Sequence, residues 1–165
     1  MTAEEFNQDI SIEEVLERYS SMVFRLAFSK TRSKSDAEDI TQEVFLKYIK
    51  SDKNFNDEEH RKAWLLKVTI NASKTLLMSA WFRRTTMIEE ADEIVTELNE
   101  KSEVYYAVLK LPAKYRQIVH LYYYEDMSIE SVSNITGIKS STVKSQLHRA
   151  RLMMRESLKE DADFV

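Results

Sequence analysis

The sequence contains no cysteine, a single glycine and a single proline among its 165 residues. The absence of cysteine excludes disulfide bonds and metal sites built from thiolates, and it is compatible with a reducing compartment. Gly137 and Pro112 are too few to punctuate a series of β-hairpins. A chain that is rich in Leu, Ala, Glu, Lys and Met and poor in these breakers therefore predicts an all-helical protein.

Long apolar runs are absent as well, since none approaches the roughly 20 residues that cross a bilayer. The acidic N-terminal stretch MTAEEFNQDI also lacks the apolar segment of a signal peptide, so we expect a cytoplasmic protein without membrane insertion. His60, His120 and His148 stand apart from one another and from any HExxH pattern, so no metal site is expected. No nucleophile–base spacing and no glycine-rich phosphate loop is present, so we expect neither enzymatic activity nor a cofactor.

The net charge of −4 conceals an uneven distribution of charge along the chain. Residues 61–84 carry six Lys or Arg and no acid, and residues 139–155 carry five Lys or Arg and no acid. Between them, residues 87–103 carry seven Asp or Glu against one Lys. DNA responds to local rather than net charge, so the sequence predicts two basic modules separated by an acidic linker. The predicted domains are residues 1–85, the linker 86–103, and residues 104–165.

The segment SIESVSNITGIKSSTVKSQLHRARLMMRESL, residues 128–158, has the pattern of a helix-turn-helix. Gly137 supplies the positive φ angle that a sharp turn between helices requires, and the small Ser133 lets the helices approach. A second helix is expected from about Ser140, which we expect to cap it. One side of this helix is an apolar stripe of Val143, Leu147, Ala150 and Met154. Its other faces are basic or carry hydroxyls, which suits the major groove of DNA, whereas the alternative is a helical hairpin with a solvated basic face.

Residues 35–50 predict a helix that begins with a capping box formed by Ser35 and Glu38. Helical spacing puts the apolar residues on one side and a polar face on the other. The polar face consists of Asp36, Asp39, Gln42, Glu43 and Leu46. A leucine in such a face indicates either an ordinary solvated surface or a docking surface with Leu46 as its anchor.

Residues 51–60 predict a loop, and its only aromatic, Phe55, either tucks onto the core or stacks on an exposed base. Residues 61–84 predict a long helix that ends in Trp81 and Phe82 beside two arginines. Aromatics interleaved with cations suit single-stranded nucleic acid, and core packing is the alternative. A further helix after Pro112 is expected to have one core-facing stripe, formed by Tyr115, Ile118, Val119, Tyr122 and Tyr123.

The motifs of both modules resemble those of a bacterial sigma-70 family factor of the small, extracytoplasmic-function (ECF) type. DAEDITQEVFLKYIK (residues 36–50) and AWLLKVTINAS (residues 63–73) are similar to the family's regions 2.2 and 2.3–2.4. LPAKYRQIVHLYYYEDMSIESV (residues 111–132) and GIKSSTVKSQLHRAR (residues 137–151) are similar to its second conserved module, region 4. The two modules stand in the family's order and cover nearly the whole chain.

The resemblance implies an all-α protein of two small helical domains joined by an acidic linker, the second domain a helix-turn-helix. It also implies a factor that binds core RNA polymerase and directs promoter recognition, melting of the −10 element and transcription initiation. The residues it implies for polymerase binding are Asp39, Gln42, Glu43 and Leu46. Those for the −10 region are Asn54, Phe55, Lys67, Asn71, Lys74, Arg83 and Arg84. Those for the −35 element are Thr142, Lys144, Ser145, His148, Arg149 and Arg151. The implied partners are the β′ clamp and β subunit of core RNA polymerase, promoter DNA, and an anti-sigma factor of the kind that often holds such proteins.

A second hypothesis is a helix-turn-helix transcriptional regulator whose N-terminal helices serve dimerisation rather than polymerase binding. It explains residues 128–158 equally well. It does not explain the polar face around Leu46 or the acid-free segment of residues 61–84.

Overall fold

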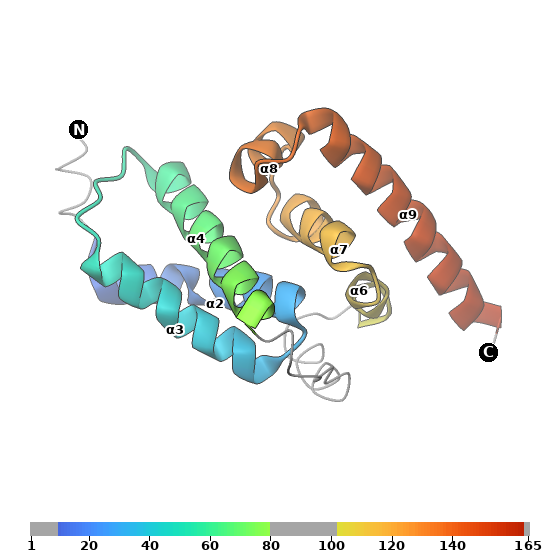
Figure 1. Cartoon of the computed structure of the whole chain (residues 1–165), viewed down its shortest axis with the longest axis horizontal. Helices are drawn as coiled ribbons and strands as arrows, with labels where there is room; N and C mark the ends of the chain where they lie inside the picture. The colour runs from blue at the N-terminus through green and yellow to red at the C-terminus, as the bar shows by residue number, and fades with distance from the viewer. Residues whose placement is uncertain (1–9, 80–101, 164–165) are drawn as a thin grey trace. The chain divides into compact units, whose positions relative to one another are not determined.

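The computed structural model describes residues 10–79 and 102–163, which form helices joined by short turns, with no strand among them (Figure 1). The all-α fold predicted from composition is therefore confirmed. The chain divides into two compact units, which are described separately. No helix in the described ranges is both long enough and apolar enough to cross a membrane.

The first unit contains three helices: α2 (Ile12–Thr31), α3 (Lys34–Lys50) and α4 (Glu58–Ser79). α2 packs against α4, and the apolar positions that recur at helical spacing on all three helices are buried. The most deeply buried aliphatic residues of this core are Val15, Val23, Leu26, Ile40, Val44, Leu65, Leu66 and Ile70. The predicted amphipathic helices of this module are thus confirmed.

Two helix boundaries in the first unit differ from the sequence-based expectation. α3 begins at Lys34, so Ser35 lies inside the first turn, and the predicted Ser35–Glu38 capping box does not stand at the helix start. α4 begins at Glu58, which shortens the predicted loop of residues 51–60 to residues 51–57. Asp57 starts this helix because its Oδ1 accepts a hydrogen bond of 2.8 Å from the N–H of His60. The apolar periodicity of the sequence begins only after this cap. A prediction from periodicity alone therefore placed the start of α4 too late in the chain.

The second unit contains α6 (Ser102–Leu109), α7 (Ala113–Val119), the π-helix η2 (His120–Tyr124), α8 (Ile129–Thr136) and α9 (Ser140–Asp163). α9 packs against α6, α7 and α8. The core of this second unit contains Val108, Ile118, Leu121, Val132, Val143, Leu147 and Ala150. α6 takes up the last two residues of the predicted acidic linker, and the rest of that linker lies outside the described residues.

The π-helix overturns the expectation of one continuous core stripe after Pro112. Tyr115 is buried as expected, whereas Tyr123 is 47% exposed. A π turn holds more residues than an α turn, so the tyrosines that follow the buried Leu121 are rotated away from the face that α7 buries. The turn is closed by the N–H of Glu125, which donates to the carbonyl of His120, and by a buried contact of 3.2 Å between His120 Nε2 and Glu125 Oε1.

Candidate nucleic-acid interface

Three local hydrogen bonds fix the two ends of α8, one at its start and two at the turn into α9. Ser128 caps α8, since its Oγ accepts from the N–H of Ser131 over 3.1 Å. Gly137 has φ +76°, and its N–H donates to the carbonyl of Ser133 over 2.9 Å, so α8 ends on a left-handed residue. The Oγ of Ser133 then donates to the carbonyl of Ile138 over 2.6 Å, across the turn. The predicted helix-turn-helix is confirmed, and Ser133 contributes a hydrogen bond as well as its small size.

α9 begins at Ser140 itself, so this serine does not occupy the predicted capping position. Lys139 precedes the helix, and its carbonyl accepts the first helical hydrogen bond from the N–H of Val143 over 2.9 Å. Val143, Leu147 and Ala150 are buried against the rest of the unit. Burial of this stripe orients the remaining faces of α9 toward solvent.

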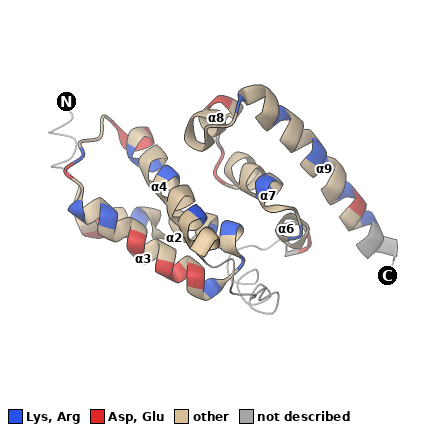
Figure 2. Ribbon diagram, in the orientation of Figure 1, with Lys and Arg blue, Asp and Glu red and all other residues tan. Residues whose placement is uncertain are grey.

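All six residues predicted on the DNA-reading helix are exposed (Figure 2 shows basic residues along α9). They are Thr142, Lys144, Ser145, His148, Arg149 and Arg151. They do not share one environment, however, because Arg151 donates from Nε to the hydroxyl of Tyr123 over 2.6 Å. Its guanidinium also lies 5.7 Å from the centre of the Tyr123 ring. Arg151 therefore lies on the flank of α9 that faces the π turn.

A polar hollow of about 350 Å³ lies on the other flank, between the start of α7 and α9. It is lined by Lys114, Tyr115, Ser141, Thr142, Ser145, Gln146 and Arg149, with no acid among them. A hydrogen bond with Arg149 holds the pKa of Tyr115 below its usual value against the opposing effect of burial, and the charge of Lys114 acts in the same direction as the hydrogen bond. The sequence did not place Lys114 beside the reading helix, because only tertiary packing brings α7 to α9.

Asn54 and Phe55, which the sequence paired in one role, differ in accessibility. Phe55 is 1% exposed, and its ring stacks on Tyr48 and meets Trp64 edge-on. Of the two alternatives for this aromatic, the structure has the one in which it tucks onto the core. A ring in this position cannot stack on a base, so Asn54, which is exposed, is the member of the pair that nucleic acid can reach.

A strip of polar and basic side chains follows one side of α4. Lys67, Asn71 and Lys74 are exposed and repeat at intervals of four and three residues, so they lie on one helix face. The adjoining end of the helix also exposes Leu77 and Met78. The remaining two residues predicted for this surface, Arg83 and Arg84, lie outside the described residues, as do Trp81 and Phe82.

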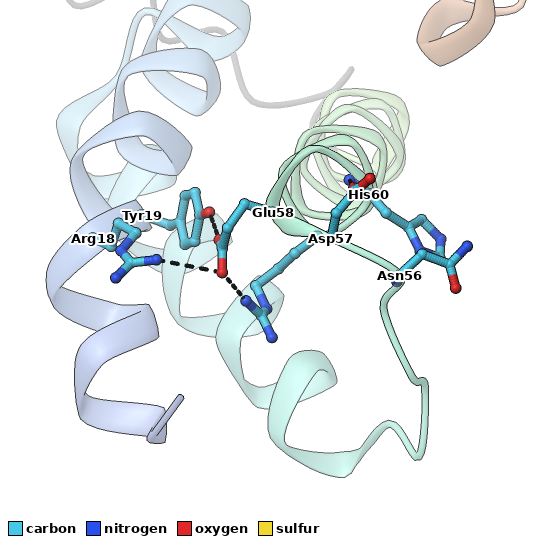
Figure 3. A network of polar contacts seen from close by, with 7 residues as sticks. Arg18, Tyr19, Asn56, Asp57, Glu58 and His60 are labelled. Atoms are coloured by element: carbon cyan, nitrogen blue, oxygen red, sulfur yellow. Dashed lines mark hydrogen bonds and ion pairs between the residues drawn. The ribbon is translucent and has the colours of Figure 1, made fainter. Parts of the chain in front are cut away.

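The loop of residues 51–57 and the start of α4 are held by the polar network that Figure 3 shows. Glu58 accepts hydrogen bonds from Tyr19 and from the fully buried Arg61, and it pairs with Arg18 at 3.3 Å. The guanidinium of Arg61 also lies 5.4 Å from the centre of the Phe55 ring. The carboxylate of Glu58 therefore links α2, through Tyr19 and Arg18, to Arg61, whose guanidinium lies beside the Phe55 ring of the loop.

The polar face of α3 is exposed at Asp39, Gln42 and Glu43, and Leu46 within it is 53% exposed. Glu43 pairs with Lys47 at 3.0 Å along the helix surface. Ile49 is also exposed and extends the apolar part of this surface, which the sequence did not indicate. The α3 face (Asp39, Gln42, Glu43, Leu46 and Ile49) thus has an apolar centre beside carboxylates.

Two family models match the chain. The model described as "Sigma-70 region 2" matches residues 15–83, which include most of α2 and all of α3 and α4. The model described as "Sigma-70, region 4" matches residues 101–154, which include α6 to α8 and most of α9.

Similar proteins and similar solved structures are sigma factors as well. The chain is 33% identical to RNA polymerase sigma factor SigV of Bacillus subtilis over 84% of this chain and 86% of that protein. It is 28% identical to ECF RNA polymerase sigma factor SigE of Mycolicibacterium smegmatis over 90% of this chain and 62% of that protein. A similar fold occurs in the sigma factor RpoE of Bartonella quintana, solved with the anti-sigma factor NepR. The TM-score is 0.67 and the identity 21%, over 89% of this chain and 96% of that one.

Proposed function

The chain belongs to the sigma-70 family of RNA polymerase sigma factors, of the ECF type, and it directs RNA polymerase to promoters; from this premise we propose how its two units divide the promoter between them. The second unit binds the −35 element as duplex. The first unit captures the −10 element as single strand and also docks on the polymerase. Sigma factors initiate transcription without catalysing a reaction of their own, so every role below is one of binding.

Recognition of the −35 element is assigned to the exposed face of α9. A helix that follows a tight turn and is basic and hydroxyl-bearing on its outer faces enters the major groove. Thr142, Ser145 and Arg149 line or border the acid-free hollow beside Lys114, so phosphates meet no carboxylate there. Lys144 and His148 are exposed outside this hollow on α9. Arg151, which is bonded to the hydroxyl of Tyr123, lies on the opposite flank of the helix.

Capture of the −10 element is assigned to the loop of residues 51–57 and to the strip on α4. Asn54 is exposed at the loop, where its amide has both donors and an acceptor for the edge of an unpaired base. Lys67, Asn71 and Lys74 form a row along which the melted strand runs, with the two lysines holding phosphates. We propose the same role in holding the strand for Arg83 and Arg84, which lie outside the described residues. Contacts of this kind offset the cost of unpairing the DNA.

Docking on core RNA polymerase is assigned to the α3 face. Leu46 supplies an apolar anchor, and Asp39 and Glu43 select a basic partner surface, which we take to be the β′ clamp. The second unit contacts the β subunit in this proposal. An anti-sigma factor is a further proposed partner, since the solved relative with the same fold was crystallised with one. The protein then acts on polymerase in the bacterial cytoplasm.

The observation that carries the proposal is the coexistence of three surfaces, one on the second unit and two on the first. The helix-turn-helix presents an acid-free reading helix, and the other unit presents both an acidic, apolar-centred face and a basic strip. A regulator that only binds duplex DNA needs the first surface alone.

The test is run-off transcription with purified core polymerase, followed by mapping of the start sites. The expected result is initiation at defined positions that depends on this protein. A pull-down with core polymerase in the absence of DNA complements it, because a sigma factor forms a stoichiometric complex and a simple regulator does not. Specific binding to DNA without any complex with polymerase would favour the regulator.

A further inference from the structure

His60 lies where the loop of residues 51–57 joins α4 (Figure 3). Its Nδ1 accepts a hydrogen bond of 3.1 Å from the backbone N–H of Asn56. Its own backbone N–H donates to Asp57 Oδ1 over 2.8 Å, and its ring meets the Phe55 ring edge-on at 5.2 Å. Side chain and backbone of this one residue therefore bind the last three residues of the loop.

Three of the contacts that anchor the loop can be named, and Asn54 lies between the first two of them. At its start, the N–H of Ser51 donates to the carbonyl of Lys47 over 2.9 Å, which ties it to the end of α3. Phe55 anchors its middle from within the core. The bond from Asn56 to His60 is the third anchor, and it is a solvent-exposed hydrogen bond to a half-buried side chain rather than a contact buried in the core. It is the anchor that a change in solution conditions can release.

The bond requires a neutral imidazole. Nδ1 accepts a hydrogen only while it carries a lone pair, and in the imidazolium both ring nitrogens carry hydrogens. Protonation of the ring therefore replaces the acceptor that faces the N–H of Asn56 with a second donor. Two donors that face each other repel, and the loop loses its third anchor.

The charged groups around the ring do not replace this bond. Asp57 is engaged by the backbone N–H of His60, and Glu58 by Tyr19, Arg18 and Arg61. Glu59 is exposed on the next position of the helix, and from α3 the titratable side chain that reaches this cluster is Tyr48, whose ring stacks on Phe55. Within the described residues the imidazole makes its polar contact with the backbone of Asn56 and not with a carboxylate.

We propose that His60 is a positioning residue for −10 base capture: in its neutral form it holds the loop so that Asn54 meets an unpaired base, and its protonation loosens the loop. The inference rests on the proposed function, which assigns this loop to the −10 element. Promoter opening then falls on acidification for a reason built into this chain. An exposed hydrogen bond of this kind corresponds to roughly a two- to tenfold change in the population it stabilises.

The experiment compares His60→Asn, His60→Ala and the control Glu59→Gln with the wild type, each as the full chain in holoenzyme. Asparagine places Oδ1 near the position of Nδ1 and accepts without titrating, whereas alanine removes the acceptor. Opening is followed with 2-aminopurine in the −10 region of a promoter found by start-site mapping, at about pH 8 and about pH 5.5. Far-UV circular dichroism and binding to core polymerase, which the proposal assigns to α3 of the same unit, are measured in parallel and report whether the first unit of each variant is folded.

The expected result is a pattern across the four proteins. Wild type and Glu59→Gln lose opening on acidification, His60→Asn keeps it, and His60→Ala is low at both pH values, with polymerase binding and circular dichroism equal in all. If His60→Asn falls with acid as the wild type does, the inference is overturned, and this comparison holds even where His60→Ala fails to fold. A folded His60→Ala that opens the promoter normally also overturns it. If the wild type opens no promoter at any pH, the proposed function fails, and this inference fails with it.

Discussion

Arg151 donates from Nε to the hydroxyl of Tyr123 over 2.6 Å, whereas Arg149, two residues earlier, lines the hollow that contains Tyr115. The sequence placed both arginines in one set of DNA contacts. In the structure each of the two arginines bonds to a tyrosine, but Arg149 meets Tyr115 inside the acid-free hollow, whereas Arg151 lies against the Tyr123 ring on the opposite flank of α9. Equal charge on one helix therefore does not mean equal roles.

Arg149→Ala is expected to weaken −35 binding more than Arg151→Ala does. A guanidinium that reaches a base or phosphate contributes about 1–3 kcal/mol, so the first change should cost at least tenfold in affinity and lower the salt slope by about one. Arg151→Ala should lower the affinity for −35 DNA less, because it removes the bond to Tyr123 on the flank of α9 rather than a side chain of the hollow. Fluorescence anisotropy of a −35 duplex, titrated with the protein at several salt concentrations, measures both quantities. Equal losses, or a larger one for Arg151→Ala, would contradict the assignment.

Gly137→Ala is expected to destabilise the second unit through backbone strain alone. Gly137 has φ +76°, and a Cβ added there would meet no atom within 4 Å, so no clash contributes. A left-handed conformation costs an alanine about 1–2 kcal/mol, which lowers the melting temperature of a unit of this size by several degrees. Gly137→Asn is the matched control, because asparagine tolerates this conformation better and should lose less. The melting temperature of each variant is measured by thermal unfolding monitored with circular dichroism. An asparagine variant as unstable as the alanine variant would argue against strain as the cause.

The sequence was sufficient for the features whose cause is local. The helix-turn-helix followed from one glycine, one small residue and the spacing of apolar residues, and each has the predicted place. The exposure of Leu46 followed from its angle on a regular helix. Periodicity and turn chemistry act between residues a few positions apart, so a sequence displays them directly.

The features that the sequence missed depend on contacts between distant segments. Nothing local marks the π turn at His120, which turned Tyr123 out of the core and toward Arg151. Phe55 is buried because Tyr48 and Trp64, on two other elements, surround its ring. Lys114 lies beside the reading helix only because α7 packs on α9. Such placements become visible only when the fold is known.

Leu46→Asp is expected to abolish the complex with core polymerase while leaving the fold intact. Leu46 is more than half exposed, so an aspartate there disturbs no packing, but it removes the apolar anchor and adds charge to the centre of the α3 face. Ile12→Asp is the matched control, since Ile12 is also an exposed aliphatic residue of the first unit and lies outside that face. The affinity of each variant for core polymerase is measured by surface plasmon resonance, with circular dichroism to check folding. Unchanged affinity for Leu46→Asp would remove the docking assignment.

The stability of the first unit is expected to fall as the pH rises from 10 to 12, and Tyr19 is the reason. Burial, together with the hydrogen bond that its hydroxyl donates to Glu58, raises the pKa of Tyr19 from its ordinary value of 10.0 to about 12. In the unfolded chain the phenol loses its proton near pH 10, while the folded protein still holds it. The folded state therefore binds more protons across this window, and by linkage its stability decreases as pH increases, with the contribution fully present below pH 10.

Tyr19→Phe should remove that part of the alkaline slope while keeping the ring in the core. Other tyrosines and lysines also titrate above pH 10, so the informative quantity is the difference between the two proteins rather than either curve. Urea unfolding at pH 8, 10 and 11.5 gives this difference. The wild type should be the more stable at pH 8, because it retains the hydrogen bond to Glu58, and the gap should narrow at pH 11.5. A gap that stays constant across the three values would mean that the Tyr19 phenol ionises alike in the folded and unfolded chains, and that its bond to Glu58 does not hold the proton.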